Sequence, residues 1–492
     1  MKRLSSKTVG ALPALIEQSD YDRKQPAGIV HIGLGAFHRA HQASYFDALM
    51  ATGERDWMIT GASLRRPQVA DQMNPQDGLF TLCERSGAHT RYRMIRSVQN
   101  VIVAPDDPSE LVRALAAPET ALVTLTITEK GYCLDPAIGA LMIEDPAIAA
   151  DLENIQSPST APGFLVAGLA ARRAAGITPF TILSCDNIPE NGLRTKRAVL
   201  ELARQIDPDL ATWIEAEAAF PSSMVDRIVP ATTPDDLVAL EQAIGLVDEA
   251  MVKTEPFTQW VVEDTFCNRR PPLERVGVQM TKDVAAWEAV KLRLLNAAHS
   301  ALAYLGALGG YEYVHTAMSA PEYASFIDRL WDEAQSTLAP IAGFDPTSYR
   351  QQLVQRFLNS ALEHRTRQIA TDGSQKVPQR FLASIQRRRE MGLKSPALIL
   401  AVAAWIRWQF GEDEHGAAYQ VDDPLAVETR QIVEANSDDA MNLARAMAAF
   451  EPVFADQFAD DQDFIEMLGV ALQGLMTSGA AATIREDASR ST

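Results

Sequence analysis

The stretch WEAVKLRLLNAAHSALAYL, residues 287–305, places four polar side chains on an apolar helical pattern. It is rich in Ala and Leu and lacks Gly and Pro, which predicts an α-helix. At about 100° per residue, these side chains fall within an arc of roughly 140° and are Glu288, Lys291, Asn296 and His299. So apolar a helix should be buried, and burying these groups costs free energy unless they are paired or line a functional cavity. The alternative is ordinary structure: a surface pair between Glu288 and Lys291 and a hydrogen-bonded core histidine.

Such a set of groups could transfer protons, for example at an alcohol from which a hydride is removed. An ordinary lysine has a pKa of about 10.4, so burial would have to lower the pKa of Lys291 for it to act as a base near neutral pH. Removing a hydride from the alcohol leaves an oxyanion. Two neutral amides, Asn296 and Asn187, could donate hydrogen bonds to it without titrating.

Near the N-terminus, GIVHIGLGAFHRAHQASYFDAL at residues 28–49 predicts a strand, a glycine turn and a helix. In dinucleotide-binding turns of this kind, glycines let the backbone approach the pyrophosphate at the start of a helix. Here the third glycine of GxGxxG is replaced by a histidine, so the motif alone is weak and an ordinary turn is the alternative. The position after a strand and before a helix favours cofactor binding. The predicted cofactor contacts in this stretch are Ile32, Gly33, Leu34, Gly35, Phe37 and His38.

The next predicted strand, WMITGA at residues 57–62, is not followed by the acidic residue that usually binds the ribose 2′-hydroxyl. Arg65 and Arg66 stand there instead. They could accept a 2′-phosphate or be solvated, so NAD is the expected cofactor and NADP stays open.

Two further buried strands are predicted at residues 121–128 and 180–184, and loops at the carboxyl ends of such strands bind ligands in α/β proteins. The first runs into TEKGY, in which Thr128 and Glu129 are predicted cofactor contacts. The second runs into CDNIPENG, which contains Asn187. A plain turn and a helix cap are the respective alternatives. Two later strand-like stretches, FPSSMVDRIVP and EPFTQWVVED, carry acidic residues at or near their ends, among them Asp226.

The chain has 492 residues, which favours two domains. Alternating strands and helices predict an α/β domain over residues 1–280, a Rossmann-type cofactor-binding domain. From residue 281 to 492 the pattern is mostly α-helical. The predicted helices lie at about 283–305, 321–338, 346–364, 376–391, 396–411, 424–436, 438–449 and 461–478.

Composition narrows the function classes. With 47% hydrophobic and 22% charged residues the chain is well folded, and a net charge of −19 argues against a nucleic-acid or anionic membrane partner. The four cysteines are far apart without a CxxC pair, which suits reduced thiols and suggests no structural metal. No signal peptide or membrane span is predicted, so the expected location is the cytoplasm.

Several long stretches in the same order resemble the polyol-specific long-chain dehydrogenases. They are GLGAFHRAHQ, TEKGY, SCDNIPENG, FPSSMVDRIVP, EPFTQWVVED, KLRLLNAAH and DGSQK, and they cover nearly the whole chain. The resemblance implies an N-terminal Rossmann-type domain, a largely helical C-terminal domain and a metal-independent reaction. A monomer is typical of the family.

The family's catalytic pattern is a lysine, an asparagine five residues later and a histidine three beyond that, as in Lys291, Asn296 and His299. The resemblance implies that Lys291 is the general base during oxidation and the acid during reduction. Asn296 and Asn187 would stabilise the alkoxide, and Glu288 would relay protons. His299 and Asp226 would orient groups or bind substrate hydroxyls.

Within the family, HRTRQIATDGSQKVPQR and EKGYC are more similar to the fructuronate reductases than to the mannitol 2-dehydrogenases. The implied reaction is the NAD-dependent interconversion of D-fructuronate and D-mannonate, with Lys130, Arg365 or Arg367 as candidate partners of the substrate carboxylate. The alternative is the same chemistry on a neutral polyol such as mannitol or arabinitol. A protein that binds a dinucleotide without turnover is disfavoured by the intact set of catalytic groups.

Overall fold

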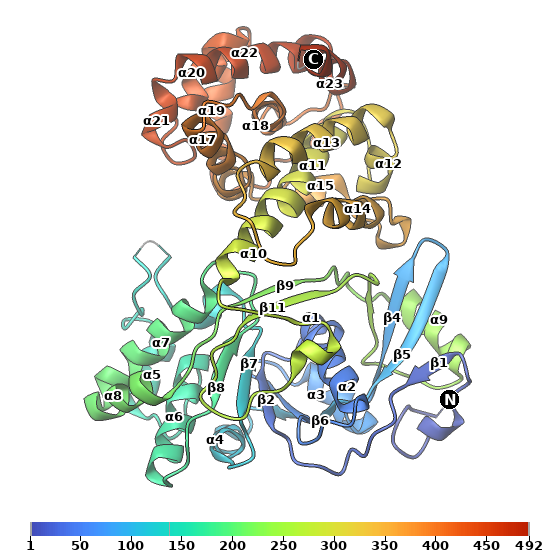
Figure 1. Cartoon of the computed structure of the whole chain (residues 1–492), viewed down its shortest axis with the longest axis vertical. Helices are drawn as coiled ribbons and strands as arrows, with labels where there is room; N and C mark the ends of the chain where they lie inside the picture. The colour runs from blue at the N-terminus through green and yellow to red at the C-terminus, as the bar shows by residue number, and fades with distance from the viewer. Residues whose placement is uncertain (1, 137, 491–492) are drawn as a thin grey trace. The chain divides into compact units, whose positions relative to one another are not determined.

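The computed structural model describes residues 2–136 and 138–490, and the chain divides into two compact units, Met1–Ala285 and Ala286–Thr492 (Figure 1). Each unit buries its own large side chains, such as Phe164 and Trp260 in the first and Trp331 and Trp405 in the second. The predicted fold class, a Rossmann-type α/β domain followed by a mostly helical domain, is confirmed.

Within the described residues, the central sheet of the first unit has five parallel strands in the order β6-β3-β2-β7-β8. Their bounds are β2 (Ile29–Ile32), β3 (Ile59–Ser63), β6 (Val98–Val103), β7 (Leu122–Leu125) and β8 (Thr181–Ser184). From β2 the chain winds to one side through β3 and β6, then to the other through β7 and β8. In such a sheet, ligands bind at the carboxyl ends of the strands where the winding reverses, which here is between β2 and β7.

The helices of the first unit connect these strands. They are α1 (Ala36–Ala40), α2 (Gln42–Ala51), α3 (Gln68–Met73), α4 (Pro108–Ala116), α5 (Pro146–Glu153), α6 (Ala161–Ala174), α7 (Asn191–Ile206), α8 (Pro208–Glu217) and α9 (Pro234–Ile244). Short 3-10 helices lie at Val9–Ala11, Asn74–Gln76, Glu129–Tyr132 (η3) and Leu273–Val276. Helix starts follow side-chain caps where the sequence offers them: Asp107 accepts a hydrogen bond at the start of α4, and Thr160 at the start of α6.

Two smaller sheets complete the first unit. One has the order β1-β5-β4-β10 and the other β12-β11-β9. The strands are β1 (Ile16–Gln18), β4 (Phe80–Ser86), β5 (His89–Ile95), β10 (Val252–Thr254), β9 (Ser223–Asp226), β11 (Gln259–Glu263) and β12 (Gln279–Thr281). The strand-like stretches predicted around Asp226 and before Asp264 are therefore the antiparallel pair β9 and β11.

The regular elements of the second unit, among its described residues, are all helices. Its elements are α10 (Val284–Val290, which begins at the end of the first unit), the π-helix η5 (Lys291–Asn296), α11 (Ala297–Leu308), α12 (Val314–Met318), α13 (Pro321–Gln335), α14 (Pro346–Phe357), the 3-10 helix Ser360–Leu362, α15 (Thr366–Ile369), α16 (Gly373–Val377), the π-helix η7 (Pro378–Leu382), α17 (Ala383–Glu390), α18 (Pro396–Trp408), α19 (Ala426–Asn436), α20 (Ala440–Ala448), α21 (Asp456–Ala459), α22 (Gln462–Thr477) and α23 (Ala480–Arg490). Every residue of α18 after Pro396 is buried, and this helix packs against α11, α13 and α22.

Several predicted elements have different bounds. The strand predicted at 121–128 ends at Leu125. Beyond it, the backbone N–H groups of Ile127 and Thr128 donate to the carboxylate of Asp186 and not to a neighbouring strand. The helix predicted at 346–364 ends at Phe357, and Glu363 adopts a left-handed conformation that a helix cannot continue through. The helices predicted at 283–305 and 376–391 are each interrupted by a π-helical segment, η5 and η7 respectively.

Among the residues that the structure describes, none of the helices has the length and apolarity needed to span a membrane.

Candidate active site

The turn after β2 is shaped for close approach of a ligand to the backbone. Gly33 has φ +90°, and a Cβ at this position would lie 2.2 Å from the carbonyl oxygen of Thr126. The Thr126 hydroxyl donates a 2.8 Å hydrogen bond to the Gly33 carbonyl, which holds the turn against the end of β7. Only glycine fits this position. The chain then passes Leu34, which is buried, and enters α1 after Gly35.

The residue in place of the third glycine is packed rather than exposed. His38 is fully buried, and its ring stacks on His31 of β2 with 3.4 Å between ring centroids. In the usual motif the third glycine allows close packing of the helix on the strand. Here two flat rings give that packing. Phe37, one residue earlier, is half-buried and stacks on His41.

The other predicted cofactor contacts follow the neighbouring strands of the same sheet. Arg65 is exposed two residues beyond the end of β3, and Thr128 and Glu129 are exposed three and four residues beyond β7. Because carboxyl ends of parallel strands lie at one edge, these residues lie at the same edge as Gly33. The Glu129 carboxylate pairs with Arg194 at 3.3 Å.

The loop after β7 is held by a carboxylate that the sequence analysis did not single out. Asp186 accepts hydrogen bonds from the backbone N–H groups of Ile127 (3.0 Å) and Thr128 (2.8 Å), and from the hydroxyl of Tyr132 (2.6 Å). Thr128 has φ +64°, a conformation that costs a non-glycine residue energy unless its surroundings hold it. Burial raises the pKa of Asp186, and these hydrogen bonds oppose the rise. In the sequence, Asp186 looks like a helix cap.

The two predicted active-site residues of the first unit lie on segments that one side chain joins. Asn187 is exposed directly after Asp186, and Asp226 is buried at the end of β9. Asn191 donates from its amide to the carbonyls of Asp186 (3.0 Å) and Ser223 (2.7 Å), and thereby joins the end of β8 to the start of β9. In the sequence, Asn191 can be recognised only as part of a possible helix cap. Nothing there indicates that its side chain joins two strands.

In the second unit, Lys291 and Asn296 lie at the two ends of the π-helix η5. The N–H of Ala297 donates to the carbonyl of Leu292, five residues back, as in a π-turn. An α-helix would place Lys291 and Asn296 about 140° apart around its axis. A π-turn brings residues five apart toward the same side, so η5 turns Lys291 and Asn296 toward one side of the helix. Lys291 is 7% exposed.

The other two predicted groups flank the π-segment. Glu288 is half-buried in α10, one turn before Lys291, and His299 follows in α11. The His299 ring lies 5.5 Å, between centroids, from both Phe357 and His364. Burial lowers the pKa of His299 well below its usual value, and interactions with His364, Arg380, Arg356 and Lys376 lower it further.

The three candidate carboxylate partners are exposed, and Arg367 pairs with Asp413 at 3.4 Å. Arg365 forms an ion pair with Glu312 and lies over the ring of Tyr313, 5.4 Å from its centroid. Lys130 lies in η3, after β7. Their roles stay predictions, and Arg365 has a carboxylate partner of its own.

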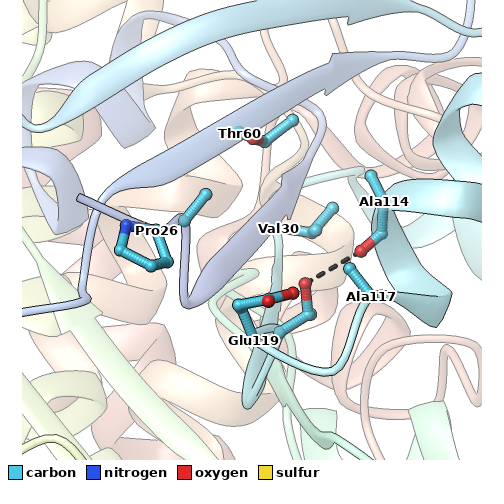
Figure 2. Close-up of a pocket in the computed structure, with 8 residues that line it drawn as sticks. Pro26, Val30, Thr60, Ala114, Ala117 and Glu119 are labelled. Carbon is cyan, nitrogen blue, oxygen red and sulfur yellow. Dashed lines mark hydrogen bonds between the residues drawn. The ribbon is translucent and has the colours of Figure 1, made fainter. Parts of the chain in front are cut away.

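A cavity of about 340 Å³ opens at the other end of the central sheet (Figure 2). It is lined near the amino ends of the strands by Pro26, Ala27, Val30, Thr60, Ala114, Ala117, Glu119 and Thr120. It contains none of the predicted site residues. Across the described residues, no group of three or more His, Cys, Asp or Glu side chains is arranged to hold a metal ion.

Comparison with known proteins covers both units. The family profile described as the mannitol dehydrogenase Rossmann domain matches residues 27–275, and the mannitol dehydrogenase C-terminal domain matches residues 283–476. The D-mannonate oxidoreductase of Escherichia coli (strain K12) is 41% identical over 95% of this chain and 97% of its own.

Two solved structures are similar over nearly the full length. A mannitol 2-dehydrogenase of Pseudomonas fluorescens, in ternary complex with NAD and D-mannitol, has a TM-score of 0.83 and 39% identity, covering 99% of this chain and 100% of that one. A D-sorbitol dehydrogenase in substrate-free form has a TM-score of 0.92 and 34% identity, covering 98% and 100%.

Proposed function

Because the chain belongs to the mannitol dehydrogenase family, we propose that it interconverts D-fructuronate and D-mannonate by NAD-dependent hydride transfer. The family makes it an oxidoreductase that acts on polyols or sugar acids. The choice of a sugar acid, and the role of each residue, is the proposal.

The first unit fits a dinucleotide at its turn after β2. The absence of a side chain at Gly33 leaves the backbone open where a Cβ would collide with Thr126, and this turn lies where the sheet's winding reverses. The residues that would hold NAD are those of the turn, Ile32 to Gly35 with Phe37 and His38, together with Arg65, Thr128 and Glu129. When bound, the nicotinamide accepts or gives the hydride.

Residues of this chain would handle the proton and the developing charge. Lys291 takes the proton of the substrate hydroxyl during oxidation and returns it during reduction. The amides of Asn296 and Asn187 donate hydrogen bonds to the alkoxide oxygen. Glu288 exchanges protons with the lysine.

The same proposal gives the remaining two groups a binding role. His299, kept neutral by burial, can donate or accept a hydrogen bond from a substrate hydroxyl. Asp226 accepts from another hydroxyl. Neither residue needs to change charge during the reaction.

The observation that favours a sugar acid is the charge around His299. Three cations, Arg380, Arg356 and Lys376, are near enough to its ring to lower its pKa. A substrate carboxylate would be attracted by this field, whereas a neutral polyol would gain little from it.

A neutral polyol is the second candidate. The solved relative that holds D-mannitol is 39% identical, against 41% for the D-mannonate oxidoreductase, so overall similarity favours neither substrate.

The deciding experiment measures initial rates of NADH oxidation with D-fructuronate and with D-fructose at equal concentrations, and repeats the better substrate with NADPH. We expect a clear preference for fructuronate. A preference for fructose would reject the sugar-acid proposal and leave a mannitol-type dehydrogenase.

The Lys291→Met variant should bind NADH and lose turnover by about 10²- to 10⁴-fold, the range of general acid–base catalysis. Turnover near that of wild type would reject Lys291 as the acid and base.

A further inference from the structure

The π-helix η5 needs support from outside its own backbone. In an α-helix each carbonyl accepts from the N–H four residues ahead, and a π-turn shifts this pattern by one residue. Such segments are rare because the hydrogen bonding of the wider turn is less favourable, so neighbouring groups must compensate. The side chains that bond to its carbonyls therefore bear on where Lys291 and Asn296 lie.

Two side chains from distant parts of the second unit do so. The indole N–H of Trp331, in α13, donates a 2.8 Å hydrogen bond to the carbonyl of Leu294. The guanidinium of Arg380 donates to the carbonyl of Asn296 at 3.2 Å. The second contact is made at the backbone of the residue proposed to bind the alkoxide.

Arg380 reaches this carbonyl from the second π-helix, η7, which packs against η5. The same nitrogen of its guanidinium donates a 2.6 Å hydrogen bond to the hydroxyl of Ser300, one turn after Asn296. The arginine is therefore attached at both ends of the turn that follows the π-segment. Burial lowers the pKa of Arg380 to about 10, so its charge is kept at neutral pH.

Arg380 is not held there by an ion pair. Among residues 2–136 and 138–490, no salt bridge joins Arg380 to a carboxylate, and its described hydrogen bonds go to Asn296 and Ser300. Desolvating a guanidinium without a carboxylate partner costs free energy. A half-buried charge whose described hydrogen bonds go to one carbonyl and one hydroxyl of the helix with Lys291 indicates that the position of this helix matters.

We propose that Arg380 is a positioning residue, which fixes the π-turn and so the placement of Asn296 relative to Lys291. The inference rests on the proposed function, because it assumes that these two residues act on the alcohol. Arg380 acts through Asn296 and does not need to touch the substrate.

The test compares Arg380→Ala and Arg380→Lys with wild type. A misplacement of about 1 Å can cost about 100-fold, so kcat of Arg380→Ala should fall by about 10- to 100-fold. kcat/KM should fall by the same factor, as for an interaction made in the transition state, with NADH affinity unchanged. Arg380→Lys, which keeps the charge but not the forked donor, should recover part of the loss. Adding guanidinium ions at millimolar concentration should raise kcat of Arg380→Ala.

Arg387→Ala is the matched control. Arg387 lies seven residues later in α17 and forms an exposed pair with Glu390 at 2.9 Å. Its replacement should leave kcat unchanged. If Arg380→Ala does not fold, Ser300→Ala removes one of the two acceptors and should give a smaller fall in kcat.

Hydrogen–deuterium exchange separates this inference from the proposed function. Arg380→Ala should speed exchange in the peptide covering residues 291–300, and Arg387→Ala should not, whichever substrate the enzyme uses. Loss of turnover in Lys291→Met with normal kcat in Arg380→Ala would overturn the inference alone. Unchanged exchange at 291–300 in Arg380→Ala would also overturn it. So would a loss of kcat in this variant that follows its fall in Tm and that added guanidinium does not relieve. Normal turnover in Lys291→Met would overturn the assigned chemistry instead.

Discussion

Exposure limits how much a single charged side chain can add to carboxylate binding. Arg365 and Lys130 are both exposed, and an ion pair at such a site is worth at most about 1 kcal/mol. Arg365 would also have to share or exchange its partner Glu312. Each residue can therefore tune the affinity for a sugar acid, while the less exposed cations near His299 would set the preference.

We expect Arg365→Gln and Lys130→Gln each to raise KM for fructuronate by about fivefold, the equivalent of about 1 kcal/mol. KM for fructose should not change, because a neutral substrate has no carboxylate to lose. Steady-state kinetics with both substrates would measure this. Arg430→Gln serves as control, since Arg430 is exposed and pairs with Glu434 at 2.7 Å. Equal effects on the two substrates would reject the carboxylate argument.

At the scale of elements, the loop after β7 depends on one side chain from the end of β8. The Asp186 carboxylate accepts from Ile127, Thr128 and Tyr132, and hydrogen bonds to a charged acceptor are worth about 1.5–3 kcal/mol each. An amide in its place would keep one acceptor oxygen and direct its NH₂ hydrogens at one of the two backbone N–H groups. The loop that carries Thr128 and Glu129 would then lose its conformation.

Asp186→Asn should therefore lower the thermal stability of the protein and weaken NADH binding by about tenfold or more. Calorimetry and fluorescence titration with NADH would measure the two effects. Asp209→Asn, at an exposed acid in α8, should change neither. If stability falls while NADH affinity stays at the wild-type value, Thr128 and Glu129 do not hold the cofactor.

The elements that could be predicted from sequence are those whose pattern is local. An apolar run, two glycines and a helical pattern were enough for β2, its turn and the helices after it, and Ala and Leu periodicity was enough for the helical unit. The short strands β1 and β10 could not be predicted, because IEQ and VKT become strands only by pairing with β5 and β4.

The π-segment was missed for a similar reason. The sequence KLRLLN favours an α-helix, and the one-residue shift in hydrogen bonding is supported by Trp331 and Arg380, more than 30 residues away in the chain. At the candidate site, the sequence was enough to predict the residues proposed to act on the substrate. It was not enough to predict the residues that hold their loops in place. Asp186 and Asn191 look like helix caps until the strands they join are known.

For the whole molecule, buried histidines couple stability to pH. Burial lowers the pKa of His31 to about 3 and that of His364 to about 4, and holds the pKa values of His38 and His299 well below the usual 6.5. In the unfolded chain these groups bind protons as the pH falls through about 6.5, while the folded chain does not. The stability they contribute is thus complete above about pH 6.5 and is lost as the pH decreases toward the folded-state values.

Glu333 acts in the opposite direction over the same range. It is buried and accepts hydrogen bonds from the backbone N–H groups of Ala397 and Leu398 at the start of α18, and burial raises its pKa to about 7. Its folded-state pKa lies above the unfolded value, so its contribution to stability grows as the pH falls from about 7 toward 4.5. One such group offsets only part of the loss from four histidines.

We therefore expect the free energy of unfolding to fall by about 3 kcal/mol between pH 7 and pH 5.5, since each titrating group changes it by up to about 1.4 kcal/mol per pH unit. His38→Phe should reduce this fall by about 1 kcal/mol. Among the described residues neither ring nitrogen of His38 has a hydrogen-bond partner, and a phenyl ring can keep the stacking on His31 without binding a proton. Unfolding by heat or urea at the two pH values would measure both quantities, with His89→Gln as the exposed control. A pH dependence in His38→Phe identical to that of wild type would mean that the buried ring is not one of the groups that sense the pH.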